Sequence, residues 1–99
     1  MLNRDDILNF LKEHKLLFSD KFNITKIGIF GSYARNEQTD ISDIDIIIDM
    51  SPGTEAIFEK RLSLQEMISK HFSKPVDICH LRAIKPVFRE MILKDIIYV

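Results

Sequence analysis

The chain is poor in cysteine, glycine, proline and tryptophan. Its 99 residues include one cysteine, three glycines, three prolines and no tryptophan. The single cysteine, Cys79, excludes an internal disulfide and a cysteine-rich zinc site. Because no glycine- or proline-rich linker and no low-complexity segment interrupts the sequence, we expect one folded domain over residues 1–99.

The chain also lacks an excess of charge of one sign and lacks long apolar runs. Lys and Arg total 14 against 15 Asp and Glu, a net charge of -1, which disfavours a protein that holds nucleic acid mainly through its phosphates. No stretch approaches the roughly 18 apolar residues of a transmembrane helix, and the acids near the start do not fit a signal peptide. We therefore expect a cytoplasmic protein with no membrane segment and no stable binding of nucleic acid.

Hydrophobic periodicity predicts helices and strands in alternation. The helices are expected over residues 3–18, 32–36, 54–71 and 84–95, with Asn3, Ser32 and Thr54 as N-caps. The strands are expected over residues 24–30, 43–49, 76–81 and 96–99. The order indicates an α/β or α+β fold with a small mixed sheet flanked by helices. The short link before the last strand favours an antiparallel edge strand.

Two aspartates open the isoleucine-rich run DIDIIID. Side chains two residues apart on a strand point the same way, about 6–7 Å apart, so Asp43 and Asp45 present two carboxylates on one face. Left bare, each raises the pKa of the other, and burial raises both. A divalent cation removes this penalty, and oxygen ligands suit Mg²⁺. Asp77 in PVDIC, on what should be a neighbouring strand, is the natural third ligand of a site for two ions.

A Gly-Ser turn precedes these acids. Gly31 allows the backbone to approach a ligand closely, and the N–H groups at the start of the following helix, with the Ser32 hydroxyl, form an anion site suited to phosphates. Metal-binding carboxylates and a phosphate-binding helix start together describe a site for a nucleoside triphosphate. An EF-hand calcium loop is excluded because isoleucines interleave the acids and the central glycine is missing.

Two other charged residues lie near this motif. Asp49 shares the face of Asp45 but lies about 13 Å farther along the strand, so we expect a solvated acid at the strand end. Arg35 is open to two interpretations, since it can pair with a phosphate or with a structural carboxylate. His80 and Cys79 suggest nucleophilic chemistry only weakly, because no Ser or Asp lies at a telling spacing and a strand cysteine is usually a small core residue.

The motifs GSYAR, SDIDIII and VDI resemble the pattern G-S-x-A-R-x(6)-S-D-x-D of minimal nucleotidyltransferases in the DNA polymerase beta superfamily. The residues that match are Gly31, Ser32, Ala34, Arg35, Ser42, Asp43 and Asp45. The order of the other elements resembles that family over nearly the whole chain. Asn36 departs from the pattern, since many members have glycine after the arginine.

The resemblance implies a polymerase beta palm-like fold, ATP as substrate and a protein adenylyltransferase activity. It implies that Ser32 contacts the triphosphate, with Gly31, Arg35 and Ser42 beside the nucleotide. It further implies that Asp43 and Asp45 bind Mg²⁺, and that Asp77 completes the site and activates the acceptor hydroxyl. A HEPN-domain toxin is the partner that it implies, in a hetero-oligomer with this chain as antitoxin.

We consider three hypotheses for the function of this chain. The leading hypothesis is transfer of AMP from ATP to a hydroxyl, a tyrosine, of the HEPN toxin. We expect the acceptor to come from another polypeptide, with an exposed apolar patch marking where it docks. The second hypothesis is an antitoxin that neutralises the HEPN ribonuclease by binding alone, and the third is modification of a small molecule. Nothing in the sequence identifies the preferred base.

Overall fold

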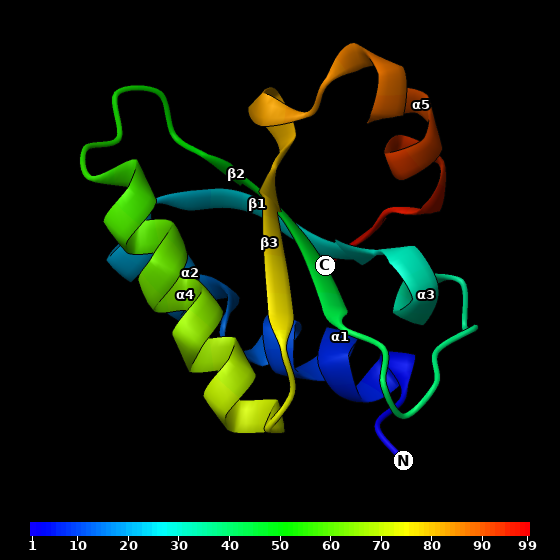
Figure 1. Cartoon of the computed structure of the whole chain (residues 1–99). Coiled ribbons are helices and arrows are strands. Elements are labelled where there is room, and N and C mark those ends of the chain that lie inside the picture. The colour runs from blue at the N-terminus through cyan, green and yellow to red at the C-terminus, as the bar shows by residue number, and fades with distance from the viewer.

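The computed structural model describes all 99 residues and contains a four-stranded sheet with helices around it (Figure 1). The helices are α1 (Arg4–Glu13), α2 (Lys15–Phe22), α3 (Gly31–Ala34), α4 (Ile57–Phe72) and α5 (Pro86–Asp95), with a 3-10 turn η1 (Leu81–Ala83). The strands are β1 (Ile24–Phe30), β2 (Ile44–Met50), β3 (Val76–His80) and β4 (Ile97–Tyr98). All four predicted strands therefore form, each within about two residues of its expected bounds.

The sheet is mixed, with the strand order β3-β2-β1-β4. β1 pairs antiparallel with β2 and with β4, whereas β2 pairs parallel with β3. This confirms the predicted mixed sheet and the antiparallel edge strand at the C-terminal end. β2 lies between β1 and β3, the strands before and after it in the chain, so the run of isoleucines lies in the middle of the sheet.

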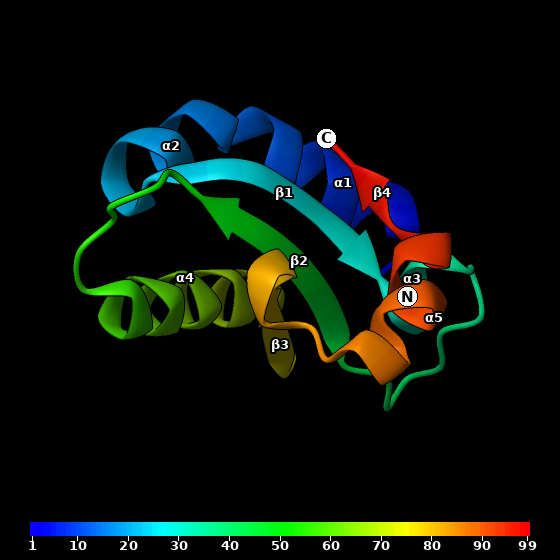
Figure 2. The same ribbon diagram turned by 90° about the horizontal axis from the view of Figure 1, so that it is seen from above.

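One face of the sheet is covered by α1, α2 and α4. The helices contribute Phe10, Phe18, Leu64 and Ile68 to a single apolar cluster. The sheet contributes alternate residues to the same cluster, among them Ile27, Ile29, Ile44, Ile46 and Ile48. The opposite face of β2 carries Asp45, Ile47 and Asp49. α3 and α5 lie next to each other on the side of the molecule away from α4 (Figures 1 and 2).

The predicted N-cap at Asn3 is confirmed, but the first helix is not continuous. Asn3 Oδ1 accepts a hydrogen bond from the backbone N–H of Asp6 at 2.9 Å, and the Asp6 carboxylate accepts one from the Asn3 N–H at 3.1 Å. This is a capping box. The helix ends at Glu13, because His14 leaves the helical conformation and its Nδ1 lies 2.8 Å from the carbonyl oxygen of Phe10. A second helix, α2, then runs to Phe22.

Two other predicted caps are wrong. Thr54 Oγ1 donates to the Ser51 carbonyl at 2.6 Å and so closes a turn, and α4 begins three residues later, after Ala56 with φ of 54°. Ser32 lies inside α3 rather than before it, since the helix begins at Gly31. The Thr54 hydroxyl bonds within a turn, and Ser32 already lies within the helix, so neither side chain caps a helix start.

None of the helices has the length and apolar character that crossing a bilayer requires. A cytoplasmic location and the lack of stable nucleic-acid binding stay predictions.

Candidate active site

Asp45 and Asp77 lie side by side on neighbouring strands. They are register partners in the parallel pairing of β2 with β3, and in-register residues of adjacent strands point to the same face, about 5 Å apart. Asp43 is exposed and lies one residue before β2, so it belongs to the same end of this face. The structure thus brings together the three carboxylates that the sequence singles out, two of them by direct strand pairing.

Asp45 is the most perturbed carboxyl of this group. Its side chain is half-buried, and its pKa is raised to about 6, first by burial and then by the charges of Asp77 and Asp43. Arg35 acts in the opposite direction and lowers this pKa. A half-buried carboxyl with a raised pKa beside two further carboxylates is typical of a functional site rather than of a structural one.

The Gly31 turn places the start of α3 next to the Asp45 side chain. Gly31 has a φ of +73°, and a β-carbon built on it would overlap the Oδ2 atom of Asp45. Only glycine therefore allows this backbone to pass so close to the carboxylate. The consequence is that the start of α3, with the partly exposed Ser32 and its unpaired N–H groups, lies directly beside the carboxylate face.

Arg35 is held by two acids. Its Nε lies 2.9 Å from Glu37 Oε1, and its Nη1 lies 3.2 Å from Asp95 Oδ2 at the end of α5. The hydrogen bond to Asp95 contributes most to the raised pKa of Arg35, followed by the one to Glu37. Of the two interpretations left open by the sequence, the structure has Arg35 paired with carboxylates. Sequence analysis did not find Asp95, which lies 60 residues away along the chain.

Ser42 organises the loop that delivers Asp43. The Thr39 N–H donates to Ser42 Oγ at 2.8 Å, and the Ser42 N–H donates to the Thr39 carbonyl at 3.1 Å. These two bonds close a turn directly before the first acid of the motif. The contact of Ser42 with a nucleotide stays a prediction.

The prediction that Asp49 is solvated is wrong. Its side chain is only 15% exposed, and its Oδ1 lies 3.2 Å from His80 Nε2 and 3.1 Å from Arg82 Nε. The partners come from β3 and η1, so this cluster ties the end of β3 to β2. Strand periodicity placed Asp49 on the correct face, but it does not reveal charges that arrive from a segment 31 or more residues away.

The three aspartates are not preassembled around an ion. No group of three His, Cys, Asp or Glu side chains lies in a metal-binding arrangement. Two of the acids, Asp43 and Asp77, are exposed and free to turn away from the like charge of Asp45. The donor set nevertheless consists of carboxylate oxygens alone, which fits a hard cation such as Mg²⁺.

A family model described as polymerase beta, nucleotidyltransferase matches residues 7–99. The chain belongs to this family. A Methanocaldococcus jannaschii relative, provisionally named a protein adenylyltransferase, is 36% identical over 100 aligned residues, which span all of both chains. The resemblance inferred from GSYAR and SDIDIII is thereby confirmed, and with it the assignment of the chain as a nucleotidyltransferase.

Solved structures share the fold of this nucleotidyltransferase. A structure provisionally named a minimal nucleotidyltransferase has a TM-score of 0.77 at 23% identity, and the match covers 97% of this chain and 95% of that one. A second is a Shewanella oneidensis complex of a tri-AMPylated HEPN toxin with an MNT antitoxin. It has a TM-score of 0.62 at 25% identity, with 93% of this chain and 69% of that chain covered. The predicted nucleotidyltransferase fold is confirmed.

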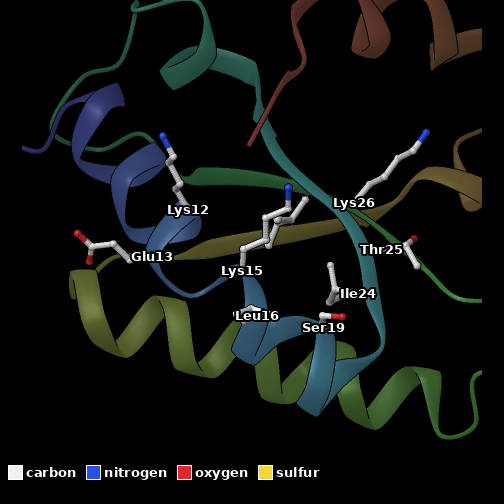
Figure 3. A pocket seen from close by; sticks show the side chains of 9 residues that line it. Lys12, Glu13, Lys15, Leu16, Ser19, Ile24, Thr25 and Lys26 are labelled. Carbon is white, nitrogen blue, oxygen red and sulfur yellow. The ribbon is translucent and has the colours of Figure 1, made fainter.

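The largest hollow of the nucleotidyltransferase does not lie at the carboxylates. It has a volume of about 560 Å³ and lies between α1, α2 and the start of β1, where Lys12, Lys15 and Lys26 line it (Figure 3). Neither of the two smaller hollows includes Asp43, Asp45 or Asp77. The three carboxylates thus lie outside the hollows of the structure, on an open face.

The raised pKa of Asp45 makes the stability of the metal-free protein depend on pH. Folding raises this pKa from 3.8 to about 6, so the folded state binds the proton more tightly than the unfolded chain does. The stabilisation is complete below about pH 4 and is lost as the pH rises through about 6. We expect the thermal midpoint to fall over this range, and to fall less in the Asp45→Asn protein. Parallel pH profiles of the two proteins would contradict the coupling.

Proposed function

We propose that this nucleotidyltransferase transfers AMP from ATP, with Mg²⁺, to a tyrosine hydroxyl of a HEPN-domain toxin and so acts as its antitoxin. The observation that carries the proposal is the in-register pair of Asp45 and Asp77 beside the Gly31 turn. The names of the similar proteins support it, since one relative is provisionally named a protein adenylyltransferase and one similar structure pairs an MNT antitoxin with an AMPylated HEPN toxin.

The transfer needs one bond to form and one to break. The acceptor oxygen attacks the α-phosphorus of ATP, its proton passes to a base, and pyrophosphate leaves. Ser32 Oγ and the N–H groups at the start of α3 bind the triphosphate and orient it toward β2. Asp77, exposed at the open face next to Asp45, takes the proton of the acceptor hydroxyl.

Asp43, Asp45 and Asp77 are the residues that would hold Mg²⁺, in a site for two ions. When bound, Mg²⁺ neutralises charge on the phosphates and makes a hydroxyl more acidic. Binding of a cation would also offset the burial and the neighbouring charges that together raise the pKa of Asp45. The half-buried position of Asp45 orients one ligand, while the exposed Asp43 and Asp77 adjust to the ions.

The open geometry favours a macromolecular acceptor over a small one. No hollow encloses the carboxylates, so a small alcohol would find few contacts to hold it there. A protein acceptor brings its own surface, excludes water and positions the hydroxyl. A tyrosine is long enough to reach an open carboxylate face from a neighbouring protein surface.

The test is an intact-mass measurement on the HEPN-domain protein of the same genome. We expect it to gain the mass of one or more AMP groups only when this chain, ATP and Mg²⁺ are all present. Peptide mapping should place the addition on a tyrosine, and a Tyr→Phe toxin should stay unmodified. If the toxin is silenced without any gain in mass, and equally well by an Asp43→Asn protein, binding alone is the mechanism.

A further inference from the structure

Helix α5 is the least packed helix of the molecule. None of its ten residues is buried. Three of its apolar side chains face solvent, with Val87 77%, Phe88 50% and Met91 69% exposed. Val87 and Met91 are four residues apart and share one side of the helix, with Phe88 next to them. We call these three residues the α5 patch. A contiguous apolar patch of this kind marks an interaction surface.

The α5 patch is bordered by positive charge. Lys85, Arg89 and Lys94 are exposed and make no ion pair, whereas Glu90 is the one acid on this helix that is not paired. The other acid, Asp95, is held by Arg35. Because the whole chain has a net charge of -1, this basic border is a local feature. The basic border of the α5 patch favours binding to a partner surface that carries carboxylates around an apolar centre.

The patch borders the candidate active site. The chain runs from β3, which carries Asp77, through η1 directly into α5. The last residue of α5, Asp95, lies 3.2 Å from Arg35 of the GSYAR motif. Figures 1 and 2 show α5 beside α3 on the side away from α4. A protein seated on the α5 patch therefore lies next to the carboxylate face.

We propose that the α5 patch is the docking surface for the acceptor protein, and that this protein offers an apolar surface surrounded by carboxylates. The inference rests on the proposed function, of which it names the recognition surface. A second copy of this chain fits less well, because two-fold pairing of α5 with itself would bring the basic border of one copy against the basic border of the other.

The experiment compares Val87→Glu with Leu16→Glu as a matched control. Both residues are the second residue of their helix, and their exposures are similar, 77% and 78%. Leu16 lies on α2, on the other side of the sheet. With the HEPN-domain protein of the same genome, we expect Val87→Glu to weaken binding by about tenfold or more and to slow AMP transfer accordingly. Leu16→Glu should match the unchanged chain, and both should bind ATP normally.

The outcomes separate this inference from the proposed function. Unchanged toxin binding by the Val87→Glu protein, with normal AMP transfer, would overturn the docking surface and leave the function standing. If Val87→Glu loses toxin binding but neither the unchanged chain nor any variant transfers AMP, the docking surface is supported and the proposed function is overturned. A dimer of this chain that Val87→Glu dissociates would identify a second copy as the occupant and overturn the inference.

A charge variant tests the chemistry of the partner. Arg89→Glu should slow association with the toxin and reduce the salt dependence of the rate, because electrostatic steering acts mainly on association. An association rate that is unchanged at low salt would show that the partner surface is not acidic and would overturn that part of the inference.

Discussion

The Asp45→Asn protein is expected to lose AMP transfer while becoming more stable without metal. The substitution keeps the shape of the side chain but removes the charge of one of the three carboxylates that we propose as Mg²⁺ ligands. It also removes a carboxyl that folding penalises, since burial and two neighbouring carboxylates raise its pKa to about 6. Because Asp45 is half-exposed, solvent screening leaves a gain on the order of 1 kcal/mol, or about 4–8 °C in Tm.

The measurement is a pair of Tm values, without and with Mg²⁺, together with AMP transfer. Mg²⁺ should raise the Tm of the unchanged protein and should have little effect on Asp45→Asn. Asp49→Asn is the matched control, since it makes the same change on the same face of β2 but touches His80 and Arg82 instead. That control should retain transfer and lose some stability. Near-normal turnover of Asp45→Asn would refute the assignment of Asp45 as a metal ligand.

Gly31→Ala is expected to have the second large effect, on stability and activity together. The new methyl group would overlap Asp45 Oδ2, and alanine would also have to adopt a φ of +73°. The backbone conformation alone costs about 1 kcal/mol, and displacement of the carboxylate adds to it, for a total of about 2–3 kcal/mol. We expect AMP transfer to be lost even where the protein remains folded, because the carboxylate and the start of α3 can no longer lie in contact.

Gly53→Ala separates the two causes. Gly53 has a similar φ, +79°, but a β-carbon there would meet no atom within 4 Å. Its Tm therefore reports the cost of the backbone conformation alone, and its AMP transfer should be normal. Equal losses of stability in the two alanine variants would show that the contact between Gly31 and Asp45 contributes nothing.

Local features of the sequence were sufficient to predict most of the elements. Asn3 and Asp6 form a capping box because both partners lie within one helical turn. The four strands follow from β-branched alternation, and the spacing of Gly31, Asp43 and Asp45 within the motif indicates the family. Each of these signals depends on residues close together in the chain, and short-range sterics and hydrogen bonds decide such features.

Other outcomes depended on residues far apart in the chain. The breaks at His14 and before Ile57 are exceptions, since the contacts there, His14 with Phe10 and Thr54 with Ser51, join residues three or four apart. The Asp49 side chain is only 15% exposed because His80 and Arg82 reach it from β3 and η1, and Arg35 is paired because α5 brings Asp95 to it. The sequence placed three acids on the correct faces, but only the parallel register of β2 and β3 put Asp77 beside Asp45. Strand pairing is a long-range choice, made by the packing of the whole sheet against its helices.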